Sequence, residues 1–174
     1  MYRMLVCMVM LIVVANGCQP AEDPQVIESR QKYTFNSEPA GALGVIDVRE
    51  KIDGDQTFTE PVVLIGRVGT DAHQTWEPGK AAFVVVDPTA EMPAHDHGPG
   101  HNHDNCPFCK AEAAKVADAS ALVRVIDEQG EVVSIDARKL FKISSGQLVV
   151  VRGMASLDAV GNLTVAAEGI YPRR

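Results

Sequence analysis

The chain has 174 residues, of which 46% are hydrophobic and 22% charged, and its formal net charge is −7. This length allows one domain with a hydrophobic core in addition to a leader, and the composition is that of a globular protein. The negative charge argues against a non-specific nucleic-acid binder, which needs basic surface to neutralise phosphates. For the same reason an anionic membrane surface is an equally poor electrostatic partner.

The N-terminal segment resembles the export signal of a bacterial lipoprotein. The apolar run Met4–Ala15 has the length of a signal-peptide core and is short for a membrane span. It leads into Ala-Asn-Gly-Cys, and small residues just before a cysteine resemble a lipobox. The resemblance implies a signal peptide at 1–17, a lipid on Cys18 with a tether over 18–35, and a protein of the bacterial cell envelope. It would be membrane-anchored and face the periplasm or the exterior; an uncleaved anchor and an ordinary secretory signal are the alternatives.

Residues 36–174 are expected to form the folded domain. Apolar spacing over 42–52 predicts a helix that ends at Asp53-Gly54. Lys110–Ala119 is rich in good helix formers, and Asp136 is placed to cap a short helix, Ala137–Phe141. Runs rich in β-branched residues and bounded by turn residues predict strands. These strands are Pro61–Val68, Ala81–Asp87, Ala121–Asp127, Leu148–Met154 and Leu163–Ile170.

The order of these elements resembles an OB-fold, a five-stranded Greek-key barrel with a short helix between strands 3 and 4. Gly66 is expected to mark a bulge or bend in the first strand. The segments VVLIGRVG, AAFVVVDP, IDEQG, DARKLF and GNLTVAAEGIY are similar to a group of uncharacterised exported bacterial lipoproteins with this barrel and, often, cysteines in the same insert. We therefore expect a mainly β fold with a helix before strand 1 and a His/Cys-rich insert at 88–119 between strands 2 and 3. A small sandwich of the same strands is the alternative, and the resemblance implies no activity.

The insert contains the densest group of metal-binding side chains, HDHGPGHNHDNCPFC at 95–109. Thiolate and imidazole suit zinc and copper, and a closed structural zinc site takes four such ligands. A Cys-x-x-Cys pair can direct two sulfurs to one ion, and His-x-His pairs on a Gly-rich loop add imidazoles. The candidate ligands of a zinc or copper ion are Cys106, Cys109, His95, His97, His101 and His103.

Two other interpretations of the cysteine pair remain open. The pair could form a local disulfide in a solvated loop, or act as a redox dithiol, because it precedes a predicted helix and a helix N-terminus lowers the pKa of a thiol. Cys-Pro-Phe-Cys resembles the thioredoxin-like active-site turn, but over four residues only, since that family places the motif in a βαβ unit.

No motif makes a positive case for an enzyme: G-x-S-x-G, HExxH and a Gly-rich phosphate loop do not occur. The expectation is a lipid-anchored, extracytoplasmic metal-binding protein for metal handling or sensing, with barrel edges open to a protein partner. The rival is a non-enzymatic interaction module with a disulfide-pinned loop.

Overall fold

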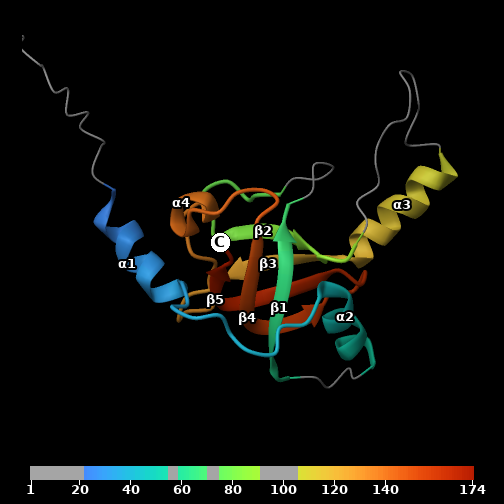
Figure 1. Cartoon of the computed structure of the whole chain (residues 1–174), viewed down its shortest axis with the longest axis horizontal. Helices are drawn as coiled ribbons and strands as arrows, with labels where there is room; N and C mark the ends of the chain where they lie inside the picture. The colour runs from blue at the N-terminus through green and yellow to red at the C-terminus, as the bar shows by residue number, and fades with distance from the viewer. Residues whose placement is uncertain (1–21, 55–58, 70–74, 91–105) are drawn as a thin grey trace, which may run out of the picture.

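A single mixed sheet closes in a ring, like a barrel, in the computed structural model, which describes residues 22–54, 59–69, 75–90 and 106–174 (Figure 1). The strand order around the ring is β1-β2-β3-β5-β4, and all neighbouring pairs are antiparallel except β3 and β5. All five predicted strands are confirmed, with shifts of one to three residues at some ends. They are β1 (Pro61–Val68), β2 (Ala82–Val86), β3 (Ser120–Val125), β4 (Leu148–Leu157) and β5 (Leu163–Pro172).

Four helices are present in the same part of the chain. α2 (Val45–Gly54) precedes β1, and α4 (Ala137–Phe141) lies between β3 and β4, as predicted. α3 (Pro107–Asp118) starts three residues before the predicted helix, because Pro107 takes the first helical position, where a missing N–H costs nothing. None of the helices in the described ranges is long and apolar enough to cross a membrane.

α1 (Pro24–Tyr33) lies within the segment for which the sequence predicts a tether. The Asp23 carboxylate accepts a hydrogen bond from the Gln25 N–H at 2.9 Å and so caps the helix. Val26 is 3% exposed, and Arg30 donates to the carbonyl of Leu140 at 2.6 Å. These contacts make residues 24–33 part of the folded domain, so the chain between Cys18 and the domain is short.

The core fills the ring and is closed by two helices. β1 alternates buried and outward residues, as expected for a strand with one face in a core. Large side chains from every strand are fully buried, and α2 adds Val45 and Val48. α4 adds Leu140 and Phe141. Figure 1 shows α2 and α4 on opposite sides of the ring, with α3 leading away from it.

At two strand positions only glycine fits, because a neighbouring strand comes too close for a side chain. β1 pairs with β4 in continuous register through Gly66, so Gly66 does not form a bulge in this pairing. A Cβ atom there would lie 2.7 Å from Cβ of Val85 on β2, which is why a side chain is excluded. The register shift lies instead between Arg152 and Gly153, where a Cβ on Gly153 would lie 2.2 Å from the Ala166 carbonyl oxygen.

Candidate functional site

The two cysteines of the insert lie at the beginning of α3. Cys106 is the N-cap residue and is half-buried, and its carbonyl accepts the Lys110 N–H at 3.1 Å, which closes the first turn. Cys109 follows three positions later, within that turn. Residues three apart in a helix lie on the same side of it, so the backbone places both cysteine positions on one side of the helix start.

The remaining predicted site residues lie outside the described part of the chain: His95, His97, His101, His103 and Cys18. Among the described residues, no three His, Cys, Asp or Glu side chains come close enough together to hold a metal ion.

The insert leaves and re-enters the ring at one point. The backbone N–H of Asp87, just after β2, donates to the carbonyl of Ala119, just before β3, at 2.8 Å. The 33 residues between β2 and β3, which include the histidines and cysteines, thus begin and end at neighbouring positions, as the antiparallel pairing of β2 and β3 requires.

Asp87 also ties this point to α2. Its buried carboxylate accepts from the Ile46 N–H at 3.1 Å, in the first turn of α2, and from the N–H and hydroxyl of Thr89 at 2.8 and 2.6 Å. Burial alone would raise the pKa of Asp87, but these hydrogen bonds together lower it below its usual value. Asp87 therefore remains ionised and caps α2 from a distant part of the sequence.

Arg49 of α2 holds the other end of the insert. Its guanidinium donates to the carbonyls of Asp118 at 2.8 Å and Ala117 at 3.2 Å, in the last turn of α3. It also donates to the carbonyls of Ser120 and of Gly161 in the β4–β5 turn. The last carbonyls of a helix have no partner within the helix and carry partial negative charge, so a cation is well placed here.

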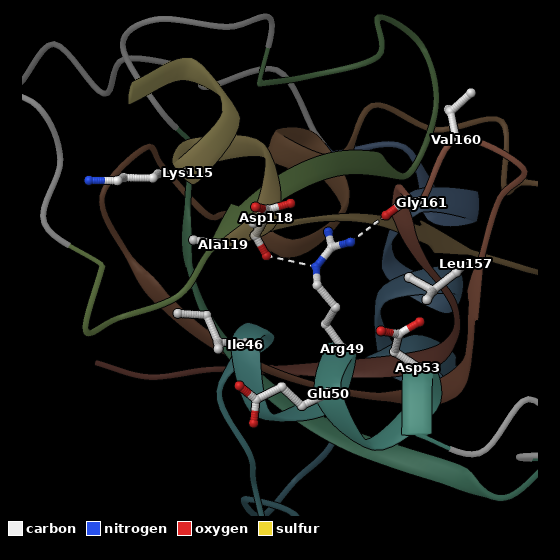
Figure 2. Close-up of a pocket in the computed structure, with 10 residues that line it drawn as sticks. All are labelled: Ile46, Arg49, Glu50, Asp53, Lys115, Asp118, Ala119, Leu157, Val160 and Gly161. Carbon is white, nitrogen blue, oxygen red and sulfur yellow. Dashed lines mark hydrogen bonds between the residues drawn. The ribbon is translucent and has the colours of Figure 1, made fainter. Parts of the chain in front are cut away.

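A cleft of about 610 Å³ lies where α2, the end of α3 and the β4–β5 turn meet. Figure 2 shows the Arg49 side chain reaching across it toward the Asp118 and Gly161 carbonyls. The Arg49 guanidinium is already bound to four backbone carbonyls. Its role here is therefore structural: it connects α2 to the end of α3, the start of β3 and the β4–β5 turn. The other charged residues at the cleft are Glu50, Asp53, Lys115 and Asp118.

Sequence reasoning did not identify Arg49 and Asp87. Asp87 followed by Pro88 signals only the end of a strand, and Arg49 is one of several charged residues on an amphipathic helix. The roles of both depend on partners about 40 and 70 residues away, which no local pattern indicates.

No protein-family model matches this chain, and no curated protein is significantly similar to it in sequence. The resemblance to exported bacterial lipoproteins therefore stays a prediction.

Proposed function

We propose that this protein is an extracytoplasmic, lipid-anchored metal-binding protein that holds zinc or copper at the insert of an OB-like barrel. The observation that carries the proposal is the position of Cys106 and Cys109, one helical turn apart at the N-terminal end of α3. The other end of α3 is tied to the ring through Arg49. The thiols thus stand on an element with a defined position next to a segment that contains four histidines.

The choice of metal follows from the donor set. Two thiolates occupy half of a tetrahedral zinc site, and two imidazoles from His95, His97, His101 and His103 complete it. The same soft donors suit copper. Four histidines for two positions allow exchange of ligands, which favours capture and handover of the ion over a permanent structural role.

The OB-like assignment is supported by three features of the ring. The strand order is β1-β2-β3-β5-β4, β3 pairs in parallel with β5, and α4 lies between β3 and β4. These features are the ones expected of a five-stranded Greek-key barrel, in which the sheet closes on itself. In this assignment the insert occupies the β2–β3 connection, and the barrel is the scaffold that presents it.

The lipid anchor is supported by the short connection between Cys18 and the domain. Only five residues separate Cys18 from the start of α1, and α1 is docked on the ring. A lipidated Cys18 would hold the protein close to the membrane of the cell envelope, facing the periplasm or the exterior.

Two rival functions of the same cysteines follow from the same geometry. Cysteines three positions apart at a helix start also suit a disulfide, which would make the insert a pinned loop for a protein partner. They suit a redox dithiol as well, because the helix N-terminus stabilises a thiolate. Each rival predicts no bound metal.

The deciding experiment measures metal content and reactive thiols together, on the full untagged chain purified in detergent without chelator. The proposal predicts nearly one zinc or copper ion per chain and insert thiols that react only after the metal is removed. Cys106→Ser should lower metal affinity at least tenfold. A chain without metal, with a Cys106–Cys109 disulfide and no zinc uptake after reduction would contradict the proposal. Catalysis of disulfide exchange that Cys106→Ser abolishes would favour the dithiol.

A further inference from the structure

A second cleft, of about 920 Å³, lies between α1, the end of α4 and the C-terminal end of β5. Four cationic side chains line it, and two carboxylates are paired with three of them. Glu22 is shared between Arg30 and Lys142, and Glu38 pairs with Arg173. The fourth cation is Arg174. The cleft therefore has an excess of positive side-chain charge on a protein whose net charge is −7.

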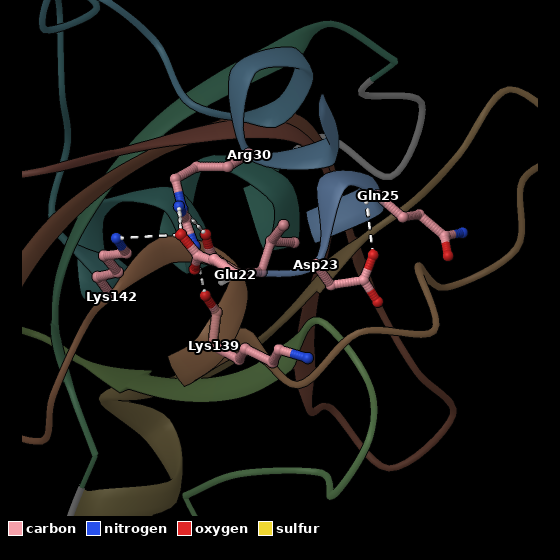
Figure 3. A network of polar contacts seen from close by, with 7 residues as sticks. Glu22, Asp23, Gln25, Arg30, Lys139 and Lys142 are labelled. Carbon is pink, nitrogen blue, oxygen red and sulfur yellow. Dashed lines mark hydrogen bonds and ion pairs between the residues drawn. The ribbon is translucent and has the colours of Figure 1, made fainter. Parts of the chain in front are cut away.

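The beginning of the folded domain is fixed at the edge of this cleft. Arg30 donates to both Glu22 carboxylate oxygens, at 2.5 and 2.9 Å, and to the carbonyls of Lys139 and Leu140 on α4. Figure 3 shows Lys142 approaching Glu22 from the side opposite Asp23. Its ammonium lies 3.3 Å from Glu22, and its side chain is 65% exposed. An exposed pair of this kind is weak, so Lys142 is available to another anion.

The short stretch of chain between Cys18, which would carry the lipid, and Glu22 at the cleft determines which surroundings the cleft faces. Cys18 precedes Glu22 by four residues, which span at most about 14 Å when fully extended. If Cys18 carries the lipid, as in the function proposed above, the basic cleft is held close to the bilayer surface. Anionic headgroups attract basic side chains over about one Debye length, roughly 10 Å at moderate salt.

We propose that this cleft is the membrane-facing surface of the protein and binds the phosphate groups of anionic lipids. The ring would then stand with α1 and the end of α4 toward the bilayer. Because Figure 1 shows α3 on the opposite side of the ring from α1, the cysteine-bearing end of α3 would point away from the membrane. This orientation would present the insert to the aqueous compartment.

The test compares lysine reactivity in two kinds of vesicle. The full chain is reconstituted into phosphatidylcholine vesicles, with and without phosphatidylglycerol, and labelled with a water-soluble amine reagent that is read by mass spectrometry. Lys139 and Lys142 should react several-fold more slowly when phosphatidylglycerol is present. Lys51 on α2 and Lys115 on α3 are internal controls and should react equally in both. The protection should vanish in about 1 M salt, where the Debye length is roughly 3 Å.

A double variant tests the charges themselves. Lys142→Gln with Arg174→Gln keeps the Glu22–Arg30 pair that docks α1, so the fold should persist, but protection of Lys139 should be lost. Lys115→Gln is the matched control and should retain it. Equal labelling of Lys139 and Lys142 in the two kinds of vesicle would overturn the proposal. Protection by inorganic phosphate alone, in phosphatidylcholine vesicles, would also overturn it and show a site for free anions.

The two proposals fail in distinguishable ways. The labelling does not depend on metal, and an uncleaved leader would hold the chain at the same end as a lipid. Protected lysines with an unmodified Cys18, read from the mass of its peptide, would contradict the lipid anchor and leave the membrane-facing cleft intact. A lipidated Cys18 with equal labelling would contradict the cleft alone.

Discussion

Asp87 shows how one carboxylate joins segments that are far apart in the chain. Its side chain accepts hydrogen bonds from the start of α2 and from Thr89, while its N–H closes the base of the insert on Ala119. The Asp87 carboxylate also lies close to the backbone before α2: a Cβ atom added to Gly44 would be only 2.4 Å from Oδ2 of Asp87. Asp87 therefore links the scaffold to the root of the proposed metal-binding segment.

Asp87→Ala should destabilise the protein by about 2 kcal/mol, because the half-buried Ile46 N–H and the Thr89 groups lose their acceptor. Chemical denaturation measures this loss: the midpoint should fall while the m-value stays unchanged. Asp127→Ala is the matched control: Asp127 also accepts from two backbone N–H groups, of Gln129 and Glu131, but in an exposed turn where water can replace it. A similar loss in both variants would contradict the role assigned to Asp87.

At the scale of elements, α3 is attached to the ring mainly at its C-terminal end. The carbonyls of its last turn are bound by Arg49, and Val116 and Ala119 are the buried residues near this end. The cysteines lie at the other end. The position of the proposed metal site relative to the ring thus depends on the contacts of Arg49 and on the apolar packing of Val116 and Ala119.

Arg49→Gln should loosen α3 from the ring, because a neutral amide has two donors where the guanidinium has five and loses the charge that favours helix C-terminal carbonyls. We expect faster amide exchange throughout α3 and a loss of about 1–2 kcal/mol in stability. Arg124→Gln, on the exposed side of β3, is the control and should leave the exchange of α3 unchanged. Unaltered α3 exchange in Arg49→Gln would show that apolar packing suffices.

The bulge between β4 and β5 makes a second prediction at this scale. Gly153→Ala should destabilise by about 1–3 kcal/mol, since the added methyl group meets the backbone of β5, which cannot move without breaking the ladder. Gly54→Ala, at the end of α2, has nothing within 4 Å of the new Cβ and should be neutral or slightly stabilising. The midpoints of thermal unfolding distinguish the two; equal midpoints would contradict the close contact.

At the scale of the whole molecule, carboxylates that are paired with cations make the free energy of unfolding depend on pH. Hydrogen bonding to Arg138 lowers the pKa of Asp136 from 3.8 to about 2. Hydrogen bonding to Arg30 likewise lowers the pKa of Glu22 from 4.5 to about 2. Both groups take up protons less readily in the folded chain than in the unfolded chain. Their contribution to the free energy of unfolding is therefore complete above their unfolded pKa values and is lost as the pH falls toward 2.

We accordingly expect the denaturation midpoint to be nearly constant from neutral pH to about 4.5, and to fall between that value and about 2. The double variant Glu22→Gln, Asp136→Asn should be less stable than the parent at neutral pH. Its stability should also fall less steeply in acid, because two of the proton-linked groups are gone. An unchanged acid slope in this variant would contradict the assignment.

The strands and most helices could be predicted from sequence because their signals are local. β-branched runs bounded by turn residues specified the five strands, and Asp136 specified the start of α4 through a cap that forms two residues away. α1 was missed because its sequence is polar, and the residues that make it part of the fold, such as Val26 and Arg30, find their partners only on the ring. The cysteines were recognised by their spacing, whereas the partners that position α3 were not.

The amino-acid sequence by itself determined which chemistry is available: two thiols three residues apart, four histidines before them, and a cysteine after an apolar leader. It also determined the number and order of the strands, since hydrophobic alternation and turn residues act over a few positions. Only the tertiary structure decided that Asp87 and Arg49 hold the two ends of the insert on α2, and that scattered basic residues gather in one cleft beside Glu22. Contacts between residues 40 to 110 positions apart depend on how the ring closes, and a local pattern carries no information about that closure.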